Sequence, residues 1–311
     1  MQLKLNNRID SRTKVGFVTT LGAFLFWGVA VMYWKLLKQV PSLELLSHRV
    51  VWSLVFVVII LSLNHGWNEF RSQLSSSRKR IALVFSAVFL CFNWLTFVWA
   101  VNAGYVVECS LGYFINPLFN VILGYIFFRE RLRPWQYVAI LFALAAVLNL
   151  TFNYNRFPWI GIMLAFSFGM YGMIRKKLEI KSLPGLGAET LVLLPFALGY
   201  ILFREISGAG AFFHLDWQKT VLLMIAGPVT AIPLLAFNHG VQRLRLTTVG
   251  LIQYVTPTGM FLLGVFFYHE SFSFTQLISF GLIWLALVLF SLEGFLFQRG
   301  QPRKKNRVTS V

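Results

Sequence analysis

The sequence has few charged residues. Asp, Glu, Lys and Arg make up only 13% of its 311 residues, whereas an ordinary soluble domain has roughly 25%. Apolar residues make up 57% and aromatic residues 17%, so the chain cannot cover a water-soluble core and is too apolar to be disordered. The apolar stretches are about 20 residues long, as in membrane-spanning helices, whereas a membrane barrel has alternating segments of about 10 residues. We therefore predict an all-α polytopic membrane protein.

Cysteine and known catalytic motifs are equally scarce. The two cysteines, Cys91 and Cys109, lie in or beside apolar stretches and cannot build a disulfide framework. The sequence has no HExxH zinc motif, no glycine-rich phosphate loop, no GxSxG elbow and no Cys/His metal spacing. We therefore expect no catalytic residues, no bound metal and no cofactor. The missing phosphate loop also excludes an ATP-driven pump made by this chain alone.

Ten apolar runs, each bounded by charged or turn-forming residues, predict ten transmembrane helices. The expected spans are 15–34, 43–63, 80–101, 107–128, 135–153, 157–174, 187–203, 219–238, 246–268 and 275–296. The first run lacks the small-residue cleavage site that ends a signal peptide, so we expect it to be retained as a span. The connections between the spans are too short to form domains.

Positive charge dominates, because 28 Lys and Arg stand against 11 Asp and Glu and give a formal net charge of +17. Most of the Lys and Arg fall on one side of the predicted spans, in segments 4–14, 71–80, 129–133, 175–181, 243–245 and 298–311. Cytoplasmic loops retain positive residues, so we expect both termini on the cytoplasmic side of the inner membrane. The basic excess is then explained by topology and by attraction to the lipid bilayer, and nucleic acid is not an expected partner.

One segment of the chain recurs after 140 residues. The stretches that begin at Pro117 and at Pro257 share four positions that are uncommon in such an apolar composition. These are Pro117 and Pro257, Gly124 and Gly264, Glu130 and Glu270, and Gln136 and Gln276. We therefore predict two five-helix repeats, 1–154 and 155–311. The second repeat is expected to be inverted in the membrane, because five is an odd number of spans.

Inverted repeats favour a transporter, because two similar bundles can alternate between inward-open and outward-open states around a shared site. No acidic residue falls at the centre of a predicted span. A cationic solute would therefore find no carboxylate there to neutralise its charge. We expect a secondary permease for a small neutral, zwitterionic or weakly anionic metabolite or drug-like solute. The alternatives are a channel-like or structural membrane protein without carrier activity, or a membrane-embedded enzyme. The sequence leaves open the direction of transport and the choice between a monomer and a homodimer.

Two prolines inside predicted spans, Pro117 and Pro257, are expected to kink their helices. Proline has no N–H, so the carbonyl groups of Tyr113 and Gln253 lose their helical donors. An unpaired carbonyl in hydrocarbon costs several kcal/mol, so each must face protein, water or solute. One interpretation is a solute cavity, and the other is a packing kink whose carbonyls are satisfied by nearby groups. The expected lining residues are Tyr113, Asn116, Gln253 and Tyr254.

Asn93 and Trp94 in the predicted third span are further candidates for solute binding. The amide can hydrogen-bond a solute, and the indole offers a flat amphipathic wall. Asparagine also joins transmembrane helices to one another through hydrogen bonds. A structural role for Asn93 is therefore the equal alternative.

The predicted second span carries a cluster of titratable residues, Glu44, His48 and Arg49. Glu44 and His48 are four residues apart and so lie on one helix face. A buried carboxylate beside an imidazole suits proton binding coupled to transport, which makes the proton the candidate coupling ion. The alternative is a gate, or a helix end whose charged groups reach the membrane surface.

Five segments carry a family resemblance: NWLTFVWAVN at 93–102, ECSLGYFINPL at 108–118, ELLSHRVVWS at 44–53, RLRLTT at 243–248 and QYVTPT at 253–258. They closely resemble the RarD-type permeases of the EamA branch of the drug/metabolite transporter superfamily. The resemblance covers nearly the whole chain and implies a ten-helix inner-membrane permease with two inverted five-helix repeats. The family tends to place Gly before the Glu that ends the fourth and ninth spans, where this chain has Arg129 and His269.

Overall fold

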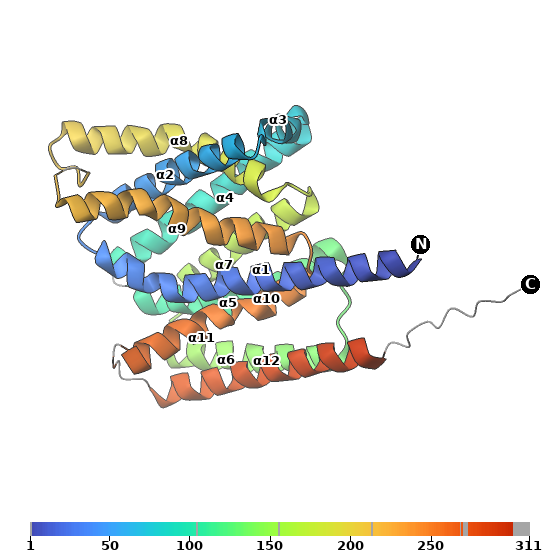
Figure 1. Ribbon diagram of the computed structural model, residues 1–311. Coiled ribbons are helices and arrows are strands. Elements are labelled where there is room, and N and C mark those ends of the chain that lie inside the picture. Colours follow the sequence, from blue (N-terminus) through green and yellow to red (C-terminus); the bar gives the residue numbers. More distant parts are fainter. Residues whose placement is uncertain are drawn as a thin grey trace, which may run out of the picture. The chain divides into compact units, whose positions relative to one another are not determined.

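The computed structural model describes residues 2–103, 105–154, 156–212, 214–267, 269 and 273–300. All regular secondary structure in these ranges is helical (Figure 1). The chain divides into two compact units, Met1–Glu130 with Arg156–Ser271, and Arg131–Asn155 with Phe272–Val311. All residues that the sequence predicts as functional belong to the first unit.

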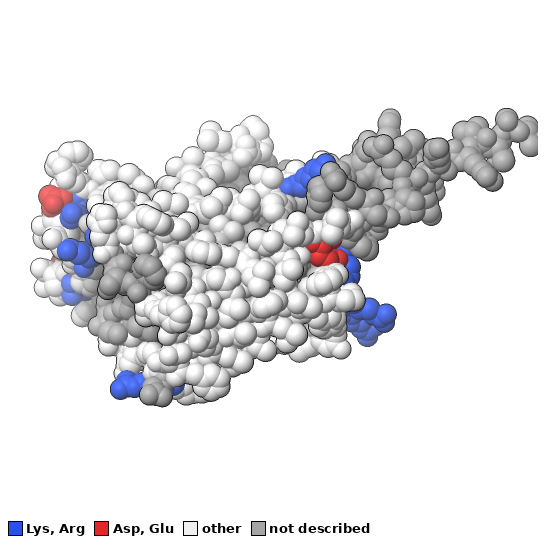
Figure 2. All heavy atoms as spheres, turned by 90° about the horizontal axis from the view of Figure 1, so that it is seen from below, with Lys and Arg blue, Asp and Glu red and all other residues white. Residues whose placement is uncertain are grey.

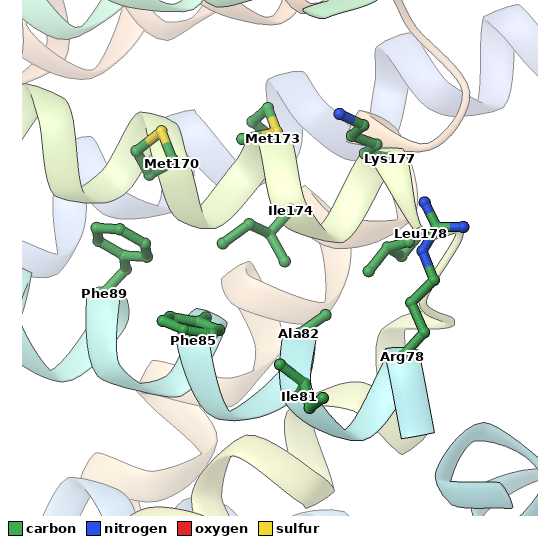
Figure 3. A pocket seen from close by; sticks show the side chains of 10 residues that line it. All are labelled: Arg78, Ile81, Ala82, Phe85, Phe89, Met170, Met173, Ile174, Lys177 and Leu178. Carbon is green, nitrogen blue, oxygen red and sulfur yellow. The ribbon is translucent and has the colours of Figure 1, made fainter. Parts of the chain in front are cut away.

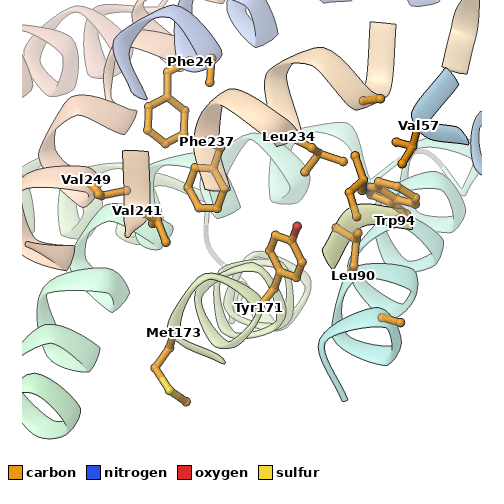
Figure 4. Packing of buried hydrophobic residues seen from close by; sticks show 14 of the residues in the cluster. Phe24, Val57, Leu90, Trp94, Tyr171, Met173, Leu234, Phe237, Val241 and Val249 are labelled. Carbon is orange, nitrogen blue, oxygen red and sulfur yellow. The ribbon is translucent and has the colours of Figure 1, made fainter. Parts of the chain in front are cut away.

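The first unit contains most of the helices. They are α1 (Gln2–Leu36), α2 (Ser42–Leu63), α3 (Trp67–Ser75), α4 (Ser77–Asn102), α5 (Val106–Phe128), α7 (Trp159–Lys177), α8 (Ser182–Ile206), α9 (Trp217–Val241), α10 (Leu246–Gln253), α11 (Val255–Leu262) and the π-helical turn η1 (Leu263–Phe267). Their buried aromatic side chains form the centre of the core, where the ring centroids of Phe24 and Phe237 are 5.8 Å apart and those of Phe168 and Phe237 are 5.0 Å apart. Figure 4 shows Phe24 and Phe237 beside each other, with Tyr171 and Trp94 in the same cluster.

The second unit consists of α6 (Pro134–Tyr154) and α12 (Phe274–Gly300), which lie side by side (Figure 1). The Asn149 amide near the end of α6 donates to the Thr275 carbonyl at 3.1 Å, near the start of α12. Arg133, just before α6, pairs with Glu293 near the end of α12 at 2.6 Å. The two helices are therefore antiparallel, with a polar contact near each end.

The two predicted kink sites differ. Helix α5 continues through Pro117, whereas α10 ends at Gln253. Each proline takes a donor from the carbonyl four residues before it, and only α10 stops at that residue. The N–H of Thr258 bonds to the carbonyl of Tyr254 at 3.2 Å, in the first turn of α11. The ninth predicted span is therefore a broken helix.

Nine helical stretches of the described chain are long and apolar enough to cross a membrane, and the protein is a multi-pass membrane protein. Helix α7 is not among them, because its last turn consists of Arg175, Lys176 and Lys177. These cations suit the negative end of the helix dipole. Helix α3 is short and polar, so the apolar runs did not predict it. Glu270, the repeat partner of Glu130, and the tail from residue 301 lie outside the described residues.

The surface also fits a lipid environment. On the face drawn in Figure 2, the charged atoms lie toward the margins and a broad uncharged area lies between them. Many large apolar side chains are exposed on the membrane helices, including Phe152, Phe196 and Phe203. A soluble protein rarely exposes so much apolar surface. In a bilayer, such side chains contact the acyl chains of the lipids.

A close approach of α2 and α9 positions the candidate site. A Cβ atom added to Gly227 would lie 2.2 Å from the carbonyl carbon of Trp52, so only glycine permits this packing distance. The Ser53 hydroxyl donates to the Gly227 carbonyl at 3.1 Å across the same contact. This crossing brings Arg49, one turn earlier on α2, next to Thr230 on α9.

Candidate functional site

Arg49 of α2 lies at the centre of the candidate site. Its guanidinium carbon lies over the indole rings of Trp34 and Trp94, 4.6 and 4.7 Å from their centroids. Its Nε donates to the Thr230 hydroxyl at 2.9 Å. The side chain therefore points toward α1, α4 and α9 rather than toward the end of its own helix. Cation–π contacts of this kind are stabilising where water is scarce.

Two tyrosines complete these surroundings. Tyr33 of α1 and Tyr113 of α5 are close enough to interact electrostatically with Arg49. The Tyr113 ring packs against Phe97 of α4, with centroids 6.2 Å apart. In the part of the chain that the structure describes, neither terminal nitrogen of Arg49 has a hydrogen-bond or ion-pair partner. Arg49 nevertheless keeps part of its surface accessible, although residues of α1, α4, α5 and α9 surround it.

The buried carboxylates of this unit are, in contrast, committed to protein partners. Glu44 is fully buried, accepts a hydrogen bond from the Ala211 N–H and pairs with Arg204 at 3.3 Å. Glu189 pairs with Arg175 at 3.5 Å and accepts from the Ser86 hydroxyl.

Glu130 has a different partner, the start of α10. It accepts from the N–H groups of Leu246 and Thr247 at 2.8 and 3.0 Å, and from the Thr247 hydroxyl at 2.7 Å. A carboxylate is favourable at this positive end of a helix dipole. The residue that the sequence singles out as part of a repeat therefore joins the end of α5 to the start of α10.

Glu44 and His48 share one helix face, as predicted, but they are not hydrogen-bonded to each other. The His48 ring stacks on Phe212 with centroids 5.0 Å apart. Neither of its buried ring nitrogens has a hydrogen-bond partner among the described residues. Buried polar groups are usually paired, so an unpaired imidazole in a membrane helix is a candidate for proton binding or for contact with water.

Most of the residues predicted near the prolines form a separate polar cluster. The Asn120 amide donates to the side-chain oxygens of Asn116 and Gln253, both at 3.1 Å. The Tyr254 hydroxyl donates to the Phe114 carbonyl at 3.1 Å. We call Asn116, Asn120, Gln253, Tyr254 and Phe114 the α5–α10 junction. Its side chains satisfy one another across the two helices, whereas Tyr113 lies toward Arg49.

Neighbouring residues of α4 have different contacts. The Asn93 amide donates to the Leu164 carbonyl at 2.9 Å and to the Ser167 hydroxyl at 3.0 Å, and so joins α4 to α7. Trp94, the next residue, lies beside Arg49. Sequence reasoning missed Trp34 and Thr230 as parts of this site. Trp34 precedes a lysine at a span end, which is the usual position of an interfacial tryptophan.

A groove of about 480 Å³ lies between α4 and α7 (Figure 3). Arg78 and Lys177 lie at one end, and Phe89 and Met170 lie toward the other. Both cations are exposed and the groove has no acidic residue in its lining. It shares no residue with the surroundings of Arg49, so the two sites are distinct.

Comparison with known proteins identifies the family. The model of the EamA-like transporter family matches twice, at residues 14–152 and 158–292. The uncharacterized transporter YojE of Bacillus subtilis is 42% identical and is aligned over 93% of this chain and 97% of its own length. Protein RarD of Escherichia coli is 40% identical over 93% of this chain and 97% of its own. These relatives point to transport rather than catalysis.

A solved structure shares the fold. It is described only as the crystal structure of a protein, and it matches with a TM-score of 0.69 over 91% of this chain and 98% of its own, at 19% identity. Protein RarD of Salmonella typhi, at 42% identity over 93% of this chain and 98% of its own, adds to the sequence relatives. The chain therefore belongs to the EamA-like transporter family, as a permease of the RarD type.

Proposed function

We propose that this permease is a secondary transporter of the inner membrane that moves a small solute by alternating access. The solute class is neutral, zwitterionic or weakly anionic. The observation that carries the proposal is Arg49, a partly accessible cation that lies among four other helices and that no carboxylate of the described residues neutralises. A polar group of this kind inside a membrane bundle is characteristic of a substrate pathway.

The proposed architecture is ten spans in two inverted five-helix repeats, 1–154 and 155–311, with both termini cytoplasmic. The double family match at 14–152 and 158–292 supports these boundaries. Arg129 and His269, 140 residues apart, both have left-handed backbone conformations, with φ of 51° and 53°. In this arrangement α7, at the place of the sixth predicted span 157–174, joins the nine other spans to make ten.

Solute contacts are proposed for Arg49, Trp94 and Tyr113. The α5–α10 junction, with Asn116, Gln253 and Tyr254, adjoins the broken helix and is proposed to change its hydrogen bonds as the transporter switches state. Asn93 is proposed to hold α4 on α7 beside the solute.

Glu44 and His48 are proposed as the coupling or gating pair, with protons as the coupling ion. If Glu44 couples, Glu44→Gln keeps solute exchange but loses accumulation driven by a pH gradient. Retained accumulation in a folded variant would exclude Glu44 from coupling. His48→Gln tests the imidazole in the same way.

Solute counterflow in proteoliposomes tests the proposed function. Vesicles that contain the purified protein are loaded with unlabelled members of a metabolite library. Uptake of the labelled solute from the outside is then followed. A carrier gives saturable uptake that is stimulated by solute on the opposite side. An ohmic current without counterflow would indicate a channel, and a chemically altered product would indicate an enzyme.

A further inference from the structure

We propose that Arg49 binds the carboxylate of an aromatic monocarboxylate, which is the solute class that this permease carries. The proposal deepens the proposed function and rests on it. It narrows the solute from neutral, zwitterionic or weakly anionic to a molecule with one carboxylate and one planar apolar body.

The first argument is charge. Among the buried carboxylates of this unit, Glu44 and Glu189 pair with arginines of their own. Glu130 accepts from the start of α10, and Glu108 accepts from the Ile160 N–H at 3.4 Å.

Among the described residues, the neighbours of Arg49 are neutral, namely two indole rings, two phenols and the hydroxyl of Thr230. A cation taken out of water needs an anion or many dipoles to offset its lost hydration. Since the described protein supplies no anion, the solute is the natural source of one.

The second argument is geometry. The guanidinium presents its donors as a planar fork that matches the two oxygens of a carboxylate. The Nε of Arg49 is already bonded to Thr230, while its terminal nitrogens have no partner among the described residues and can donate to a solute. The Tyr113 phenol lies within electrostatic range of the same group and can supply a further donor, whereas the Tyr33 hydroxyl donates to the Leu222 carbonyl. One guanidinium suits a single negative charge better than a phosphate, which carries up to two at neutral pH.

The third argument is the shape of the walls. Trp34 and Trp94 lie against the guanidinium from two different helices, and Phe97 lies behind Tyr113. Flat aromatic surfaces favour a flat ligand, because planar rings stack or meet edge to face. The solute body next to the carboxylate is therefore expected to be an aromatic ring.

Matched acid and amide pairs test this assignment by binding. Benzoate is compared with benzamide, and indole-3-acetate with indole-3-acetamide, through the thermal unfolding of the full chain in detergent. We expect the acid of at least one pair to stabilise the protein with an apparent affinity about 10-fold or more above that of its amide. Arg49→Gln should remove this preference, and Arg49→Lys should recover part of it. The matched control is Arg80→Gln, because Arg80 is exposed near the start of α4, far along that helix from Trp94. This variant should leave the preference for the acid unchanged.

Two results would overturn the proposal. One is that neither acid binds better than its amide, and the other is that a folded Arg49→Gln variant keeps the preference. Counterflow separates this failure from failure of the proposed function. Saturable counterflow of neutral solutes only, unchanged in Arg49→Gln, would leave the carrier intact and remove the carboxylate assignment. Acid binding that depends on Arg49, without counterflow of any solute, would keep the anion site and remove the carrier.

Discussion

Two arginines of the first unit, Arg175 and Arg49, have contrasting surroundings. The Arg175 side chain is fully buried and pairs with the equally buried Glu189 at 3.5 Å. It also donates to two backbone carbonyls of the turn between α7 and α8, at 3.0 and 3.3 Å. A Cβ added to Gly185 would lie 1.5 Å from its Nη1, so no further group fits there. Arg175 is enclosed by the groups that neutralise it.

Arg49 is held in a different way. Its neighbours are aromatic rings and a hydroxyl, its terminal nitrogens have no partner in the described chain, and part of its surface stays accessible. A buried charge that the fold neutralises depends on its partner to remain buried, whereas a charge framed by neutral groups is available for a ligand. The comparison therefore separates a structural cation from a binding cation inside one helical unit.

The largest effect is expected at Glu189. Glu189→Gln leaves Arg175 buried without its counter-charge, so the free energy of unfolding should fall by about 3–5 kcal/mol. Equilibrium unfolding in detergent measures it. The matched control is Glu69→Gln, because Glu69 pairs with Lys181 at an exposed position, where a change below about 1 kcal/mol is expected. A change below about 1 kcal/mol at both sites would show that the ion pair between Arg175 and Glu189 does not stabilise the folded protein.

Arg49→Gln should show the opposite pattern. It loses one hydrogen bond and two cation–π contacts but also removes a cation that the described protein does not neutralise, so the free energy of unfolding should change by less than about 2 kcal/mol. Counterflow of an anionic solute should fall about 10- to 100-fold, which corresponds to one charge-assisted hydrogen-bonded contact. A stability loss as large as that of Glu189→Gln, with transport retained, would contradict the distinction between the two arginines.

The sequence predicts where the helices lie better than it predicts which side chains meet. The expected spans 43–63 and 275–296 begin one residue after α2 and α12 begin in the structure. Apolar run length determines such boundaries, because any span must cross the same hydrocarbon thickness. Run length is a less clear guide at α7, because the three cations in its last turn reduce the apolar content of the helix.

The candidate site shows the opposite limit. The sequence places Arg49 in a cluster with Glu44 and His48, because the only spacing that it reveals is that along one helix. In the structure its neighbours come from four other helices, and Trp34 and Thr230 carry no local signal that links them to it. The Gly227 contact that sets the distance between α2 and α9 is likewise visible only after packing.

The α5–α10 junction differs from the surroundings of Arg49, because its polar groups are hydrogen-bonded to one another. The terminal nitrogens of Arg49 have no such partners in the described chain. Gln253→Ala removes one of the two acceptors of the Asn120 amide and should cost about 1–3 kcal/mol of unfolding free energy. If the junction rearranges during transport, loss of the Asn120–Gln253 hydrogen bond changes the maximal rate of counterflow more than the half-saturation concentration. Tyr113→Phe should do the reverse, because Tyr113 lies beside the proposed solute. Concentration series with both variants measure this difference, and identical kinetic effects would remove it.

The smallest effect concerns a third arginine, Arg129, whose importance lies in its backbone. Arg129 ends α5 with φ at 51°, and Glu130 follows it to cap α10. A left-handed conformation costs an L side chain about 1 kcal/mol and costs glycine little, although glycine loses more entropy on folding. Arg129→Gly should therefore raise the unfolding free energy by about 0.5–1 kcal/mol, as measured by equilibrium unfolding.

Arg131→Gly is the control for this last prediction, because Arg131 is exposed and does not have a positive φ. Glycine relieves nothing there and adds freedom to the unfolded chain, so a small loss of stability is expected. His269→Gly, 140 residues after Arg129, should repeat the gain, because its φ is 53°. A gain at both positions, with none at 131, would mean that a side chain occupies each of the two turns at the expense of stability. Losses at 129 and 269 would show instead that the side chains contribute more than their backbone conformation costs.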